Sequence, residues 1–303
     1  MSMLRTSVAG LALVAAAVAL AAESDPWIVT VPSGSDVMMT LATSSKHAYA
    51  VNPADKPWAD ASGPERAEPA LSKEEKDGLA ACRDLVAKGD HDGAAKAIDD
   101  LLAKNPANWD AHLLRASSLH ARAMDKDAVA PLRTSLVGNR RSPEAWRLLA
   151  DVAKALAKKV VRPTLDLRGW VREKSKTQIE VGGVFLKDAD MPWTYYAGAH
   201  ALYRYEGNFG RDFPAAKSYA FTFREQMFAM CVLAQEAETQ RKDGAANAAD
   251  LKLVLAEKKA GTLTPFTFFA VYPEPVPATP EPGFDALRPR LEKYFDEKVL
   301  VRR

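Results

Sequence analysis

The stretch "NWDAHLLRASSL", residues Asn108–Leu119, is followed 34 residues later by "SPEAWRLLADVA", residues Ser142–Ala153. Small and apolar residues recur at this offset beyond the two stretches as well. The matching pairs are Leu85 with Leu119, Ala94 with Ala128, Ile98 with Leu132, Leu102 with Leu136, Ala111 with Ala145, Leu114 with Leu148 and Ala116 with Ala150. Recurrence at one fixed offset indicates an internal repeat in which each unit buries its apolar face against the next.

One unit of the repeat is clear in "KGDHDGAAKAIDDLLAKNP", residues Lys88–Pro106. A glycine-containing turn precedes a helical pattern, and an Asn-Pro pair ends it. The apolar residues that share one face of this helix are Ala94, Ile98, Leu101 and Leu102. Upstream, Ser72 and Glu75 form a capping-box pattern, which begins a helix. We therefore predict helical repeats over residues 72–160.

These residues resemble the tetratricopeptide-repeat family, whose units are 34-residue helix-turn-helix hairpins. The resemblance covers residues 73–159 as two repeats and the first helix of a third. Its small residues are Cys82, Ala116, Ala150, Ala94 and Ala128, its large residues between hairpins are Ile98 and Leu132, and Trp146 and Pro106 match the family's first aromatic and terminal proline. Gly78, His112 and Arg140 depart from the pattern. The resemblance implies an all-α fold, a short α-α superhelix.

In that family the first helix of each hairpin lines a concave groove. The positions that the resemblance places there are Lys76, Leu79, Arg83, Asp110, Leu113, Ser117, His120, Glu144, Arg147, Asp151 and Lys154. We expect Leu79 and Leu113 to be apolar anchors for a protein segment, with Arg83 and Arg147 pairing acidic groups. Leu79 and Arg83 replace the lysine and asparagine with which some family members clamp a terminal carboxylate. The alternative is that all of these are ordinary exposed helix residues.

The chain beyond the repeats predicts a helical extension over 161–272, a proline-rich linker over 273–283 and a terminal amphipathic helix over 284–303 that caps the array. Its β-branched residues and Gly-Gly pair make 164–185 a loop or a small β-hairpin. Within the extension, the expected helices cover Met191–Gly207, a segment starting at Pro214, and Ala245–Ala260 closed by Gly261.

The N-terminal 21 residues have one cation, Arg5, then an apolar run that ends in small residues. This order is typical of a secretory signal peptide, with cleavage after Ala21 or Ala22. We therefore expect an exported protein, periplasmic or secreted, with no later segment that spans a membrane; an uncleaved anchor is the alternative. Residues 22–71 read as an N-terminal segment, with a possible strand at Trp27–Val31, and a linker rich in proline and alanine.

Composition narrows the function classes. A formal net charge of +2 gives no long-range field for a polyanion, so we expect no nucleic-acid partner. Two cysteines, Cys82 and Cys231, do not make a disulfide scaffold, and their apolar contexts favour buried thiols over the one bridge they could form. The five histidines are scattered, and we expect no metal or cofactor.

One cluster bears on chemistry. The segment Trp193–Glu206 places aromatic residues around a histidine, and the residues of this possible pocket are Trp193, Tyr196, His200 and Tyr203. An aromatic pocket with a titratable imidazole suits a sugar, which makes an enzyme acting on an envelope glycan the alternative function. The same residues also fit the buried stripe of an amphipathic helix. We predict a non-catalytic protein-binding or assembly module of the cell envelope; a purely structural subunit is a third possibility.

Overall fold

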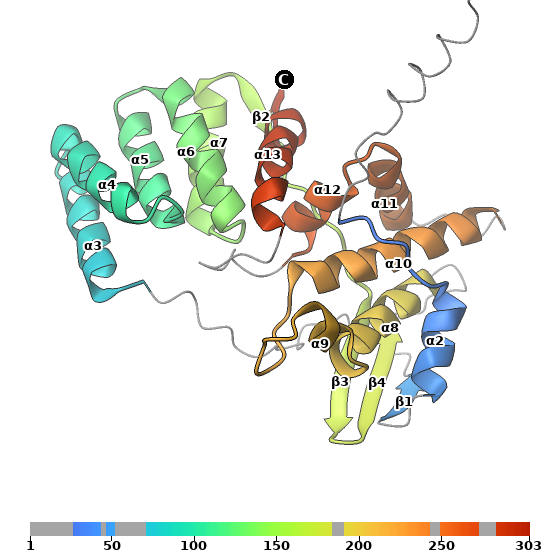
Figure 1. Cartoon of the computed structure of the whole chain (residues 1–303). Coiled ribbons are helices and arrows are strands. Elements are labelled where there is room, and N and C mark those ends of the chain that lie inside the picture. The colour runs from blue at the N-terminus through green and yellow to red at the C-terminus, as the bar shows by residue number, and fades with distance from the viewer. Residues whose placement is uncertain (1–26, 44–46, 52–70, 184–190, 243–248, 273–282) are drawn as a thin grey trace, which may run out of the picture.

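The computed structural model of the chain describes residues 27–43, 47–51, 71–183, 191–242, 249–272 and 283–303 (Figure 1). These residues are mostly helical, with two small sheets. The expected signal peptide and the expected linker at 52–70 lie outside the described residues, as does the linker expected over 273–283 except for Gly283. None of the described helices combines the length and the hydropathy that a membrane span requires.

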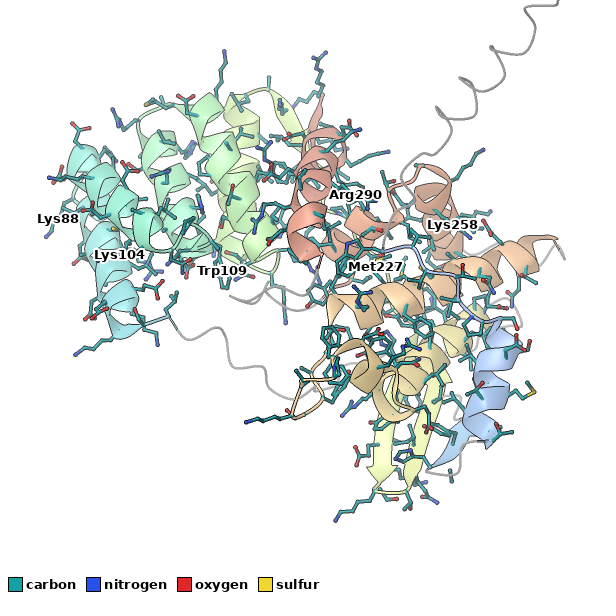
Figure 2. All side chains as sticks on the ribbon, viewed as in Figure 1. Lys88, Lys104, Trp109, Met227, Lys258 and Arg290 are labelled. Carbon is teal, nitrogen blue, oxygen red and sulfur yellow. The ribbon has the colours of Figure 1, made fainter. Side chains whose placement is uncertain are left out.

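A row of five helices follows from the repeated segment. They are α3 (Lys73–Ala87), α4 (His91–Lys104), α5 (Trp109–Ala121), α6 (Asp125–Gly138) and α7 (Pro143–Ala155). Each helix packs against the next in the chain, and α3 also contacts α5, which contacts α7 (Figure 1). In Figure 2, Lys88 and Lys104 mark the ends of α3 and α4, and Trp109 marks the start of α5.

Side-chain caps explain where α3, α4, α5 and α7 begin, whereas α6 has no side-chain cap. Ser72 and Glu75 make both bonds of the capping box that the sequence predicts. Asn108 and Ser142, at equivalent places in successive units, each accept a hydrogen bond from the backbone NH three residues later. The helical repeats predicted from the 34-residue offset are therefore present as helices.

The matched positions are the ones that pack. Ala94, Ala128, Ile98 and Leu132 are fully buried, so alanine allows the helices to approach closely while the larger residues fill the space between them. The helices α3 and α4 and the start of α5 enclose a small core of their own, which includes Cys82. The remaining helices share one continuous core with the rest of the described chain.

The end of the row is closed by the C-terminus. After α7, β2 (Lys158–Val160) pairs antiparallel with β5 (Leu300–Arg302). The helix α13 (Phe284–Tyr294), which continues as the π-helix η2 (Phe295–Val299), packs against α6. Arg133 of α6 donates to Asp296 at 2.6 Å. The terminal helix expected over 284–303 is present over residues 284–299 and lies against the row, but the expectation is wrong for Leu300–Arg302, which form the strand β5.

The second half of the molecule is built around the helix α8 (Met191–Tyr205). It packs against α2 (Gly34–Thr43), α10 (Phe223–Lys242) and a three-stranded sheet. The sheet has the order β1 (Ala48–Val51), β4 (Gln178–Gly183), β3 (Gly169–Ser175), with β1 parallel and β3 antiparallel to β4. A side chain at Gly169 would meet the carbonyl oxygen of Trp193 at 2.3 Å, so glycine lets β3 lie against α8.

Three short helices complete the molecule: α9 (Asn208–Asp212), α11 (Ala249–Lys259) and α12 (Leu263–Ala270). The helix α12 packs against both α10 and α13, and so joins the two halves (Figure 1). Arg140 makes a polar link at this joint, because its Nη1 donates to the carbonyl oxygen of Phe269 at 2.9 Å. Trp146 donates in turn to the carbonyl oxygen of Arg140 at 2.6 Å.

Several predictions of detail are wrong. Trp27–Val31 forms no strand, and the helix expected from Pro214 begins at Phe223. Thr222 sets that start, since its hydroxyl accepts from the backbone NH of Glu225 at 3.1 Å. The β-hairpin expected within 164–185 is present, but its parallel partner β1 and the helix α12 were not expected.

The cysteines are both free thiols and both buried. They lie in different cores, with Cys82 in the small core of α3 and α4 and Cys231 in the large one. The preference for thiols over a bridge is therefore confirmed. Burial raises the pKa of the Cys82 thiol, which keeps it protonated and unreactive.

Candidate functional site

The surface row, as we name the groove positions that remain accessible, runs along α3, α5 and α7. Its exposed members are Lys76, Arg83, Glu144, Arg147, Asp151 and Lys154, and its half-buried members are Asp110, Ser117 and His120. They stand at corresponding positions of the first helix of the first, second and third units, and so recur on every second helix of the row.

The two leucines do not belong to the surface row, and their assignment as anchors is wrong. Leu79 is 2% exposed and Leu113 is 9% exposed. Leu79 packs in the small core with Ile98 of α4, and Leu113 is part of the large core. A side chain that already fills the core of the chain offers no apolar surface to a partner.

Several charged members of the surface row form no ion pair with the described residues. His120 donates to Asp125 at 2.5 Å, and Arg147 bonds the carbonyl oxygen of Pro143 within its own helix. Among the described residues, none forms an ion pair with the members Lys76, Arg83, Glu144, Asp151 and Lys154. These side chains are therefore available to an outside ligand.

The aromatic cluster on α8 has a different character. Trp193, Tyr196, His200 and Tyr203 are all buried. The rings of Trp193 and Tyr196 meet edge-on at 5.5 Å, and those of Tyr196 and His200 at 4.8 Å. They pack as the core stripe of an amphipathic helix, and the four do not line a common pocket.

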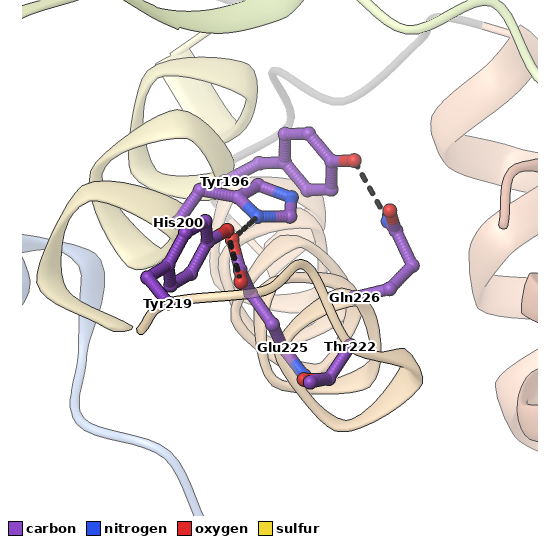
Figure 3. A network of polar contacts seen from close by, with 6 residues as sticks. All are labelled: Tyr196, His200, Tyr219, Thr222, Glu225 and Gln226. Atoms are coloured by element: carbon purple, nitrogen blue, oxygen red, sulfur yellow. Dashed lines mark hydrogen bonds and ion pairs between the residues drawn. The ribbon is translucent and has the colours of Figure 1, made fainter. Parts of the chain in front are cut away.

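His200 belongs to a buried polar network between α8 and α10 (Figure 3). Its Nδ1 donates to Oε1 of Glu225 at 2.9 Å, and Tyr219 donates to Oε2 at 2.6 Å. Beside it, Gln226 donates to the hydroxyl of Tyr196 at 2.8 Å. Burial raises the pKa of both Tyr196 and Tyr219, so both phenols stay protonated as the geometry requires.

This network contains the groups of an acid-base site, but a substrate has no access to them. The side chains of His200 and Glu225 are 5% and 2% exposed. A general base must come within about 3 Å of the proton that it removes, so a glycan outside the core does not reach this imidazole. In the described structure the network therefore joins two helices.

A second, similar group was missed by sequence reasoning. Tyr49 of β1 donates to Oε1 of Glu206 at 2.6 Å, and Nδ1 of His47 lies 3.2 Å from the same oxygen. Burial is the main cause that raises the pKa of Tyr49. These residues hold β1 to the end of α8. Nothing in the sequence relates residues so far apart along the chain.

A pocket lies away from this aromatic cluster and from the surface row. A cavity of about 400 Å³ opens between the N-terminal segment 27–32 and the helices α8, α9 and α10. Met227 of α10, labelled in Figure 2, lies in its wall. Of the four aromatic positions proposed from sequence, Tyr203 alone is among its lining residues. The remaining residues that line the cavity are Trp27, Val29, Thr30, Pro32, Leu202, Asn208, Arg211, Asp212, Arg224, Met227 and Phe228.

Metal ligands do not gather in the described part of the chain: no three His, Cys, Asp or Glu side chains there form a group that could hold an ion. No protein-family model matches the sequence, and neither a curated protein nor a solved structure matches it. Function must therefore be argued from the contacts, burial and charges of the described residues.

Proposed function

We propose that the chain is a non-catalytic binding or assembly module whose surface row receives a protein segment. The observation that carries the proposal is the row itself: charged side chains recur along α3, α5 and α7, and those on α3 and α7 form no ion pair with the described residues. The contacts of α3 with α5 and of α5 with α7 support a tetratricopeptide-like stack in which first helices share one surface.

The partner that suits this surface is a segment carrying both signs of charge. The exposed members of the row carry both signs of charge, since Arg83, Arg147 and Lys154 are positive and Glu144 and Asp151 are negative. The leucines that would have anchored an apolar side chain are buried. Each exposed ion pair contributes about 0.2–1 kcal/mol. Such binding is weak per contact, depends on several contacts together, and weakens as salt rises.

The alternative of a glycan-acting enzyme has less support. Its residues Trp193, Tyr196 and His200 lie in the core, and the carboxylate nearest to His200 is buried with it. Binding through the surface row needs no rearrangement of the described helices, whereas catalysis at His200 needs the core to open.

Site-specific photo-crosslinking tests the surface row. A photoreactive phenylalanine analogue is placed at Arg147 or Asp151 on α7 and, as matched controls, at the exposed Lys96 on α4 or Lys126 on α6. In cells that produce the protein naturally, adducts of one defined mass should form from the α7 positions and not from the controls. Equal labelling from all four positions would remove the surface row as the contact surface.

We also propose that the chain is exported, because its first 21 residues have the order of a signal peptide. Export predicts a mature chain that begins at Ala22 or Glu23. Intact-mass measurement of the protein recovered from its native compartment checks this. A mass that includes Met1 would contradict cleavage.

A further inference from the structure

We propose that the strand pair β2–β5 is a membrane-contact surface that binds a bilayer rich in anionic lipid. The basic ribbon, as we name these strands with the residues beside them, covers residues 158–162 and 298–303. It uses none of the residues of the surface row, so its test does not depend on the function proposed for that row.

The basic ribbon has cations and no acid. Neither of its two segments contains an aspartate or a glutamate, and its six basic residues are Lys158, Lys159, Arg162, Lys298, Arg302 and Arg303. All of them are exposed except Lys158, which is half-buried. None of the six forms an ion pair with the described residues.

This concentration of positive charge is local. The whole chain has a formal net charge of only +2, so the rest of the sequence carries more acidic than basic residues. A negatively charged surface therefore attracts the basic ribbon and repels much of the remaining molecule, which favours one orientation of the protein on that surface.

The pairing of the strands sets which side chains share the outer face of the ribbon. Lys159 stands opposite Val301. The backbone NH of Val161 donates to the carbonyl oxygen of Val299 at 2.8 Å, so the pairing continues past the end of β2. Because side chains along a strand alternate between its faces, Lys159 and Val161 lie on one face together with Val301 and Arg303.

The opposite face is turned inward. Leu300 is 2% exposed, and Val160 packs against the large core. The outer face is left to solvent, where Val161 is 40% exposed and Val301 is half-buried. Strand β2 and the C-terminus lie near an outer edge of the molecule (Figure 1). A flat surface can therefore approach the outer face.

Valine beside lysine and arginine suits a bilayer better than a soluble polyanion. Lysine and arginine have long side chains that reach the phosphates of lipid headgroups while their apolar stems stay near the acyl chains. Binding of a protein at such an interface increases with the apolar area that it buries and with its attraction to anionic lipids. An acidic polymer in water would pair with the cations and leave Val161 in water.

Vesicle flotation tests the proposal on the protein purified from its native compartment. Vesicles of phosphatidylcholine alone are compared with vesicles that contain about one third phosphatidylglycerol. We expect the anionic vesicles to bind the protein at least about tenfold more tightly, and this preference to shrink as salt rises. Equal binding to both kinds of vesicle, or no binding to either, would overturn the proposal.

Matched double variants locate the contact. Lys159→Gln combined with Arg303→Gln removes the two cations of the outer face and should weaken binding to the anionic vesicles at least about tenfold. The control, Lys96→Gln combined with Lys126→Gln, removes two exposed cations from α4 and α6 and changes the net charge equally. It should bind as the unchanged protein does. Equal weakening by both pairs would show that net charge, and not the basic ribbon, drives binding.

A fluorescent label reports contact at the ribbon itself. Cys82 and Cys231 are buried, so a thiol-reactive, environment-sensitive dye attaches to the new surface cysteine of Val161→Cys. Its emission should shift to shorter wavelength with the anionic vesicles, whereas the same dye at Lys96→Cys should show no shift. No shift at residue 161, or an equal shift with soluble polyglutamate, would show that this residue does not enter a bilayer.

Discussion

His112 shows how burial of a single polar atom makes stability depend on pH. Its Nε2 donates to the carbonyl oxygen of Pro106 at 3.0 Å, while its Nδ1 is buried and has no partner among the described residues. Burial is the main cause that lowers the pKa of His112, and the positive charges of Arg115 and Arg288 lower it further. A second proton on this ring would therefore stand in a site that does not stabilise it.

The sign of the effect follows from linkage. In the unfolded chain this imidazole takes up a proton near its ordinary pKa of 6.5, while in the folded chain it does so at lower pH. The stabilisation is thus complete above about pH 6.5 and is lost as the pH falls toward the lower, folded-state pKa. We expect the free energy of unfolding to decrease between pH 7.5 and pH 5.5, and to decrease less in His112→Gln. Urea unfolding at several pH values measures this, and parallel profiles for the two proteins would contradict it.

Some helices and strands can be predicted from the sequence, and others cannot. The row α3 to α7 could be predicted because alanine and large apolar residues recur at one offset and because Ser72 and Ser142 cap helices locally. The strand β1 could not, since its partner β4 lies far along the chain and pairs with it in parallel. Features that neighbouring residues encode can be predicted from one sequence, whereas pairings between distant segments cannot.

The candidate sites follow the same rule. Charged members of the surface row could be identified from the repeat, but Leu79 and Leu113 occupy positions that the resemblance places in the groove and that packing buries here. The pocket could not be predicted, because its rings and arginines come from the N-terminal segment and three helices. The sequence predicts Tyr203 as a candidate site residue because it belongs to an aromatic stripe. The structure shows that its hydroxyl donates to Asp212, which holds its side chain in place.

The joint between α8 and α10 depends on the Glu225 carboxylate. Glu225→Ala leaves His200 and Tyr219 without the acceptor that both now use, in a place from which water is excluded. We expect a loss of about 3 kcal/mol in the free energy of unfolding, and a smaller loss for Glu225→Gln, which keeps an acceptor oxygen.

Glu238 on the same helix provides the control. It pairs with Lys258 at 2.8 Å, but its side chain is 46% exposed, so Glu238→Ala should cost about 1 kcal/mol or less. Chemical denaturation followed by circular dichroism measures all three variants. Equal losses for Glu225→Ala and Glu238→Ala would show that the buried network contributes no more than a surface pair.

At the scale of the whole molecule, α13 and η2 tie the helix row to the second half. Leu287, Leu291 and Phe295 are buried in the large core, and Arg133 of α6 pairs with Asp296. The helix α12 packs against α13 from the other half. Loss of the contacts that α13 makes should therefore destabilise both halves.

A point substitution tests this role. Leu291 is fully buried, and Leu291→Ala should lower the free energy of unfolding by about 2–5 kcal/mol, whereas the exposed Lys293→Ala on the same helix should be close to neutral. Hydrogen exchange read by mass spectrometry locates the effect: we expect faster exchange in both α6 and α12. Faster exchange confined to α13 would show that this helix does not connect the two halves.

The pairing of β2 with β5 also bears on biosynthesis. Strand β2 leaves the ribosome directly after α7, but the strand that pairs with it, Leu300–Arg302, is made only after the second half of the molecule. Contacts between such distant segments close late and slowly. The flank of α6 that α13 covers and the polar groups of β2 therefore stay uncovered until that later part has been made. The helix row is thus closed only after the second half of the molecule has been synthesised.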